Sequence, residues 1–289
     1  MPPGGAVGAG RLRYAEPMPP TAVALALGAA ILHATWNLLA AREKDIHAAT
    51  AIAMLVSVVA CLPLVPFTWA VQPAAVPWVI ASSALELAYF VLLATAYTRF
   101  EVSVVYPVAR GSAPVLVLLG GVLFTGAGAS PAQAAGVALV ALGVVLVRGV
   151  GRGAVPDLLG GLAIAMTIAT YTIVDREGIR HADAVSYYAL IVALPAVCYL
   201  GWVGRHGLAR LRATAHPPVL VAGLAMLATY LLVLTALRIA PAASVAAVRE
   251  TSVVVAAFLA RAFLHEAVGA RRILGSAVVA AGIAAVAVG

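Results

Sequence analysis

The two halves of the chain carry the same unusual residues at a constant spacing. Arg110 and Arg249 both lie inside apolar stretches, where a charged side chain is costly, and they are 139 residues apart. The same offset relates three further pairs, Arg99 with Arg238, Gly136 with Gly275 and Gly143 with Gly282. The glycines lie about two helical turns apart in each half, which predicts close helix packing. We therefore predict two copies of one helical unit, residues 21–150 and 151–289.

Composition places both units in a membrane. The chain is 64% hydrophobic and 10% charged, with a mean hydropathy of +1.06, which is unlike a soluble domain. Apolar runs of about 18 to 25 residues can cross a bilayer as helices. The predicted spans are 21–41, 46–70, 76–98, 102–124 and 131–148, then 158–175, 184–204, 217–237, 241–263 and 271–289. We expect an all-α, multi-pass protein of the cell membrane, of the bacterial inner-membrane type, with ten transmembrane helices.

The odd number of spans in each unit fixes the relation between the copies. After five crossings the second copy starts on the opposite side of the membrane, so the chain forms two inverted five-helix pseudo-repeats, as secondary transporters do. Residues 1–20 are rich in Pro and Gly and lack the apolar core of a signal peptide, which predicts a disordered tail. Connections no longer than about 15 residues leave no room for a soluble catalytic domain.

The net charge of +7 comes from basic residues scattered singly at span ends, so nucleic-acid binding is not expected. With the two intramembrane arginines set aside, the side of the termini carries Arg11, Arg13, Arg176, Arg180 and Arg238. The opposite side carries Arg42, Lys44, Arg99, Arg148, Arg152, Arg205, Arg210, Arg212, Arg261, Arg271 and Arg272. Because cytoplasmic loops carry the excess of Lys and Arg, this distribution places both termini outside the cytoplasm.

Polar residues at membrane depth are candidates for function, because lipid offers them no hydrogen-bond partner. His33, Trp36 and Asn37 share one face of the first span. We expect that face to point into the bundle, either to bind a ligand or a proton or to hold helices together. In the corresponding sixth span, Tyr171 is a further binding candidate. Asp175, four residues later, is expected to be a solvated helix end.

Glu86 has apolar sequence on both sides, and Tyr89 lies one turn away on the same face of the third span. A buried carboxyl group is protonated unless a cation or hydrogen-bond donors stabilise its charge. The partners expected for Glu86 are Arg110 and His33. It would then contact substrate or carry a coupling proton, with a purely structural ion pair as the alternative.

Two prolines interrupt the fourth span around the first intramembrane arginine. Tyr106 and Arg110 are one turn apart, and Pro107 and Pro114, one before and one after Arg110, interrupt the backbone hydrogen bonding around them. Broken helices of this kind are tolerated at membrane depth where they line a cavity. Tyr106 and Arg110 are therefore predicted to contact substrate.

In the ninth span, Arg249 is followed directly by Glu250. Adjacent side chains diverge by about 100° around a helix, so we do not expect these two to neutralise each other. Guanidinium groups match the geometry of carboxylate and phosphate. We predict that Arg110 and Arg249 clamp an anion, with Glu250 as a nearby acid; arginines that tie helices together are the alternative.

Together these motifs resemble the EamA-type transporters of the drug/metabolite transporter superfamily, over about residues 21–289. The resemblance rests on HATWN at 33–37, YPVARG at 106–111, YTIVD at 171–175 and RETS at 249–252, followed by Glu266 and Gly275. More narrowly, the chain resembles the branch labelled "phosphonate utilization associated". Relatives carry an acid where this chain has Ala127 and a glycine where it has Arg176.

The resemblance implies a central cavity formed by the first four helices of each half, alternating access, and export of small polar metabolites in exchange for protons or another substrate. It also implies cytoplasmic termini, in disagreement with the charge distribution. We predict a secondary transporter, an exporter of a zwitterionic or anionic metabolite such as an amino acid or amino-phosphonate. The alternatives are a flippase for lipids or lipid-linked sugars and a multidrug exporter of cationic amphiphiles.

Catalysis is not expected, because no nucleophile elbow, metalloprotease spacing or phosphate-binding loop occurs in the sequence. The predicted partners are the small-molecule substrate, the lipid bilayer and protons as a coupling ion, with no metal or cofactor. One copy of the chain is sufficient, since each half supplies the partner for the other, and a dimer is also compatible with the sequence.

Overall fold

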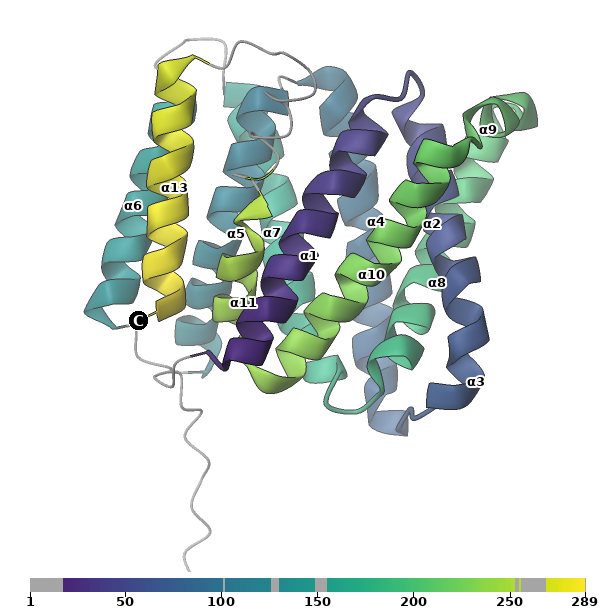
Figure 1. Cartoon of the computed structure of the whole chain (residues 1–289), viewed down its shortest axis with the longest axis horizontal. Coiled ribbons are helices and arrows are strands. Elements are labelled where there is room, and N and C mark those ends of the chain that lie inside the picture. The colour runs from purple at the N-terminus through teal and green to yellow at the C-terminus, as the bar shows by residue number, and fades with distance from the viewer. Residues whose placement is uncertain are drawn as a thin grey trace, which may run out of the picture.

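The computed structural model describes residues 18–100, 102–125, 130–148, 155–252, 255 and 269–288. Within these ranges the chain is helical, apart from loops and one isolated bridge between Val71 and Ala182 (Figure 1). The first half contains α1 (Pro20–Ala41), α2 (Ile46–Cys61), α3 (Val65–Thr68), α4 (Val76–Arg99), α5 (Val102–Thr125) and α6 (Pro131–Arg148). The second half contains α7 (Val155–Gly178), α8 (Ala184–Gly204), α9 (Leu208–Thr214), α10 (Pro217–Ile239), α11 (Ala242–Arg249) and α13 (Ala270–Val288).

Six segments are long and apolar enough to cross a membrane: Pro20–Ala40, Ile46–Thr68, Pro73–Ala96, Val155–Gly178, Ala184–Gly204 and Pro217–Ile239. They coincide with the first three spans predicted in each half. Shorter apolar helices lie within α5 and α13, and α11 covers only the start of the predicted span 241–263, most of whose remainder is outside the described residues. The all-helical membrane class is thus confirmed for the described chain, while the count of ten spans stays a prediction.

Proline and glycine explain where the helices depart from the predicted spans. The second span continues past α2 through a 3₁₀ turn at Leu62–Leu64 into α3, because Pro63 and Pro66 interrupt regular α-helical bonding. The short α9 was not predicted. Gly207 reverses the chain after α8 with a φ of 122°, a value that favours glycine, and Leu211 of α9 then packs on the core.

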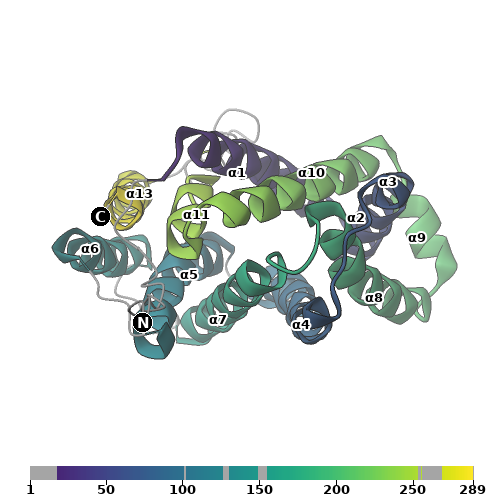
Figure 2. The ribbon, with the colours of Figure 1, turned by 90° about the horizontal axis from the view of Figure 1, so that it is seen from below.

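The helices of the two sequence halves interleave. α1 packs on α10 and α11, and in the same way α7 packs on α4 and α5. Figure 2 shows α1 and α10 along one side of the molecule and α7 and α4 along the other, with α11 between α1 and α5. α1 begins and α13 ends at the same end of the bundle (Figure 1). Any cluster at the centre therefore receives residues from both halves.

α6 and α13 pack closely through the repeated glycines. A Cβ atom added at Gly143 would lie 2.7 Å from the backbone nitrogen of Val279, and one added at Gly282 would lie 2.7 Å from the backbone oxygen of Gly136. Larger side chains would force the helices apart, so the predicted packing role of these glycines is confirmed. This pair lies at one side of the molecule, next to α5 and α11 (Figure 1).

Candidate functional site

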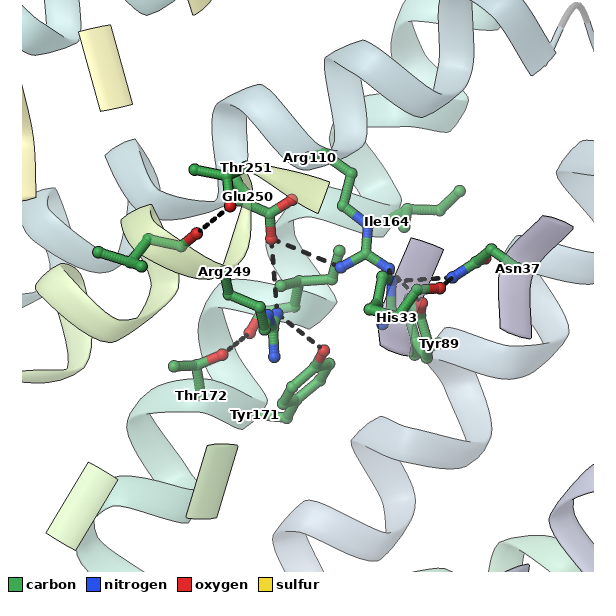
Figure 3. Close-up of polar contacts among 12 residues, drawn as sticks. His33, Asn37, Tyr89, Arg110, Ile164, Tyr171, Thr172, Arg249, Glu250 and Thr251 are labelled. Atoms are coloured by element: carbon green, nitrogen blue, oxygen red, sulfur yellow. Dashed lines mark hydrogen bonds and ion pairs between the residues drawn. The ribbon is translucent and has the colours of Figure 1, made fainter. Parts of the chain in front are cut away.

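Six buried polar residues from five helices form a cluster that we call the arginine centre. Its members are His33 on α1, Tyr89 on α4, Arg110 on α5, Tyr171 on α7, Arg249 on α11 and Glu250, which caps α11 (Figure 3). No member has more than 6% of its surface exposed. The sequence predicted all six as binding residues, and the fold brings all six together.

Arg110 is the most connected member of this centre. Its guanidinium donates a hydrogen bond of 2.9 Å to the Tyr89 hydroxyl, contacts Nε2 of His33, and forms an ion pair of 3.5 Å with Oε1 of Glu250. The Tyr89 ring centroid is 6.0 Å from the guanidinium carbon, which is within the range of a cation–π interaction. Arg110 thus joins α1, α4 and the end of α11.

Arg249 shares a carboxylate oxygen with Arg110. Its Nη2 lies 3.6 Å from Oε1 of Glu250 and donates a longer hydrogen bond, 3.4 Å, to the Tyr171 hydroxyl. Arg249 and Glu250 are neighbours in the chain, but the same Glu250 oxygen also pairs with Arg110, so Glu250 does not neutralise Arg249 alone. Glu250 therefore lies between two arginines.

The charges of the arginine centre do not cancel. Arg110 and Arg249 carry two positive charges, and Glu250 supplies one negative charge. His33 adds none, since Trp36 donates its indole N–H to Nδ1 of His33 at 3.2 Å, and a doubly protonated imidazole cannot accept a hydrogen bond. Counted over these six residues, the centre carries one more positive than negative charge, which favours an anion.

The polar face predicted on the first span points toward Arg110. Asn37 Nδ2 lies 2.9 Å from Nε2 of His33 and donates to the His33 carbonyl at 2.8 Å. The His33 and Trp36 rings meet edge to face, with centroids 5.2 Å apart. Trp36 and Asn37 therefore act on the arginine centre by holding the His33 ring.

Three buried polar atoms near the end of α11 have no hydrogen-bond partner among the described residues: Nε of Arg249, Oε2 of Glu250 and Oγ of Ser252. A buried polar group left unsatisfied costs about 1–3 kcal/mol. They include a charged donor and a charged acceptor on adjacent residues, beside a helix break. A ligand with both an anionic and a cationic group could satisfy them together.

A second buried cluster, which we call the carboxyl centre, consists of Ser82 and Glu86 on α4, Asp175 on α7, Tyr187 on α8 and Tyr230 on α10. The Tyr230 hydroxyl lies 2.7 Å from Oε1 of Glu86 and 2.5 Å from Oδ2 of Asp175. Ser82 and Tyr187 donate to Oδ1 of Asp175 at 2.6 and 3.2 Å. One hydroxyl therefore connects two buried carboxyl groups.

Two sequence predictions about these acids were wrong. Asp175 is 1% exposed and is not a solvated helix end, because α7 continues to Gly178 and α4, α8 and α10 pack around it. Glu86 takes Tyr230 as its hydrogen-bond partner, whereas Arg110 takes Glu250 as its ion-pair partner. The partners were misassigned because Glu250 and Tyr230 lie on segments far away in sequence.

The two centres share two helices. Glu86 and Tyr89 are one turn apart on α4, and Tyr171 and Asp175 are one turn apart on α7. The Tyr89 and Tyr171 rings pack edge to face between the centres, with centroids 5.8 Å apart. A shift of α4 against α7 would therefore change both centres at once.

One of the ten predicted site residues, Tyr106, has a side chain outside the described part of the structure, so its predicted contact with substrate stays a prediction. Sequence reasoning missed Ser82, Tyr187 and Tyr230 and misjudged Asp175. The spacing of four residues between Ser82 and Glu86, and the polar hydroxyl of Tyr230 inside an apolar span, were available signals. Neither signal specifies which helices meet.

A bundle of apolar helices with charged groups buried between two repeated halves defines a polytopic membrane protein. The chain belongs to the EamA-like transporter family, which matches residues 20–149 and 156–288. It is thus a membrane transporter of the drug/metabolite type. A solved structure described only as "Crystal structure of protein" is similar in fold, with a TM-score of 0.64 and 18% identity over 92% of this chain and 96% of that one. No curated protein matches the sequence.

Proposed function

We propose that this protein is a secondary transporter that exports a small zwitterionic or anionic metabolite, such as an amino acid or amino-phosphonate, by alternating access. The observation that carries the proposal is the arginine centre, in which two buried guanidinium groups share one carboxylate oxygen. The unsatisfied donor on Arg249 and acceptor on Glu250 suit a substrate with an anionic group next to an ammonium group.

The proposed architecture is ten helices in two inverted five-helix repeats in a bacterial inner membrane. Helix pairings that recur between the halves, α1 with α10 and α7 with α4, support the repeat. The central position of the arginine centre agrees with a transport site built at a repeat interface. Protons or a second substrate would drive the cycle, and a monomer would suffice.

Substrate counterflow in proteoliposomes tests the proposal, with amino acids, amino-phosphonates, phosphorylated metabolites and cationic amphiphiles as cargo. We expect exchange of a zwitterion or anion, and loss of exchange in Arg110→Ala and Arg249→Ala proteins that still insert in the membrane. Arg180→Ala is the matched control, since Arg180 is exposed and forms a surface ion pair with Glu177. Normal exchange by both centre variants would refute the clamp.

A flippase for lipids or lipid-linked sugars, or an exporter of cationic amphiphiles, is the second candidate. The excess positive charge of the arginine centre disfavours cationic cargo. Exchange of cationic amphiphiles alone, unaffected by either arginine variant, would select that alternative and assign the arginines a structural role.

A further inference from the structure

We infer that Glu86, Tyr230 and Asp175 form a proton-binding site in which one proton is shared between two carboxyl groups through the tyrosine hydroxyl. The site is separate from the arginine centre. Its role as the coupling site rests on the proposed transport function, whereas its occupancy by a proton rests on geometry alone.

The Tyr230 oxygen makes two short contacts, and one hydroxyl cannot supply the hydrogen atoms for both. The Tyr230 oxygen lies 2.7 Å from a Glu86 oxygen and 2.5 Å from an Asp175 oxygen, and both distances require a hydrogen atom between the oxygens. A tyrosine hydroxyl supplies one hydrogen. Two such contacts need two, so at least one of the carboxyl groups carries a proton.

The surroundings of the two acids decide where that proton resides. Asp175 accepts hydrogen bonds from Ser82 and Tyr187 in addition to Tyr230, and several donors stabilise a carboxylate. The hydrogen bond described for Glu86 goes to Tyr230. Glu86 therefore carries the proton and donates it to the Tyr230 oxygen, while Tyr230 donates its own hydrogen to Asp175.

This arrangement allows a proton to move between the two halves of the chain. The Glu86 O–H bond breaks as a new O–H bond forms on Tyr230, and the original Tyr230 O–H bond breaks as one forms on Asp175. The tyrosine stays neutral, and the net result is transfer of one proton from α4 to α7. Tyr230 on α10 relays the proton, because its hydroxyl accepts one hydrogen from Glu86 while it donates another to Asp175.

Other buried ionisable groups lie on the helices that form the two centres. They are Arg110 on α5, Arg249 and Glu250 at the end of α11, Tyr89 on α4, Tyr171 on α7, Tyr187 and Tyr188 on α8, and His33 on α1. The arginines already share Glu250 as their ion-pair partner. The hydrogen bonds described for the two carboxyl groups come from the hydroxyl groups of Ser82, Tyr187 and Tyr230.

Infrared spectroscopy of the purified full-length protein at neutral pH tests the inference without any substrate. We expect a carbonyl stretch from a protonated carboxyl group, and loss of that band in Glu86→Gln. In Tyr230→Phe the band should persist but move to higher wavenumber, because the protonated carboxyl group loses its hydrogen-bond acceptor. The matched controls are Glu177→Gln, whose exposed carboxylate pairs with Arg180, and Tyr199→Phe, whose hydroxyl contacts His47. Both should leave the band unchanged.

Absence of the band in the wild-type protein, or a band that survives both Glu86→Gln and Asp175→Asn, would overturn the inference. Tyr230→Phe keeps the test decisive if an acid variant does not fold. In proteoliposomes, Tyr230→Phe should retain substrate exchange and lose accumulation driven by a pH gradient, and unchanged pH-driven accumulation would also count against the site. Absence of any exchange in the wild-type protein would contradict only the proposed transport function, because the infrared result is independent of cargo.

Discussion

The arginine centre and the carboxyl centre lie one helical turn apart on α4 and α7, but they bury charge in different ways. The arginine centre keeps an excess positive charge and leaves charged atoms of Arg249 and Glu250 without hydrogen-bond partners in the described chain. The carboxyl centre surrounds Asp175 with three hydroxyl donors. An unsatisfied buried polar group gains free energy when a ligand supplies its missing hydrogen bond. We therefore propose that substrate binds at the arginine centre and a proton at the carboxyl centre.

The largest expected effect is on stability, from removal of Arg110. Arg110→Ala removes the contacts to His33, Tyr89 and Glu250 together, and breaking a buried ion pair costs about 3–5 kcal/mol. Denaturant unfolding in detergent measures this cost. Arg180→Ala, at an exposed pair, should change the unfolding free energy by less than about 1 kcal/mol. Equal effects from the two variants would mean that the arginine centre is not a buried ionic network.

Replacing each acid of the carboxyl centre with its amide should lower the unfolding free energy by different amounts. Asp175→Asn replaces a carboxylate that accepts from three hydroxyls, and we expect a loss of about 1.5–3 kcal/mol in unfolding free energy. Glu86→Gln replaces a protonated carboxyl group with a neutral group of the same shape and should cost about 1 kcal/mol or less. Equal costs would indicate that Glu86 is also ionised.

Glu250→Gln tests whether the Glu250 carboxylate gives the arginine centre its preference for a zwitterion. The variant raises the excess charge from one to two and replaces the carboxylate proposed to hold an ammonium group with a neutral amide. We expect the preference for an amino acid over its deaminated analogue to fall about tenfold, which corresponds to about 1.4 kcal/mol. Ligand-dependent thermal shifts measure the two affinities, since binding raises the melting temperature. An unchanged ratio would argue against Glu250 as the ammonium site, with Glu177→Gln as the control.

The two tyrosines of the arginine centre should differ in stability cost, and Tyr171→Phe should have the smallest effect of all these variants. Tyr89 accepts from Arg110 at 2.9 Å, and Tyr171 accepts from Arg249 at 3.4 Å. Tyr89→Phe should cost about 1.5 kcal/mol, as expected for a hydrogen bond to a charged group. Tyr171→Phe should cost about 0.5 kcal/mol, because its bond is longer. A reversed order in denaturant unfolding would show that Arg249, and not Arg110, depends more on its tyrosine.

Much of the candidate site could be predicted because polar residues are conspicuous in apolar sequence. Arg110, Arg249 and Glu86 stand out for the cost of burying their charge, and the one-turn spacing of His33 and Asn37 indicated a shared face. Asp175 was misjudged because it lies near the predicted end of a span, and nothing in the local sequence shows that other helices cover it.

The sequence by itself determined the membrane class, the repeat, most helix positions and the family. These properties depend on apolar run length, spacing and motif order, which are local or periodic. Only the tertiary structure decided the partners: Glu250 between the two arginines, and Tyr230 between Glu86 and Asp175. The partners lie on helices separated by up to 144 residues in the chain, and the packing of α4, α7, α10 and α11 sets their distances. Hydrogen bonds act over a few ångströms, so pairing depends on packing and not on sequence spacing.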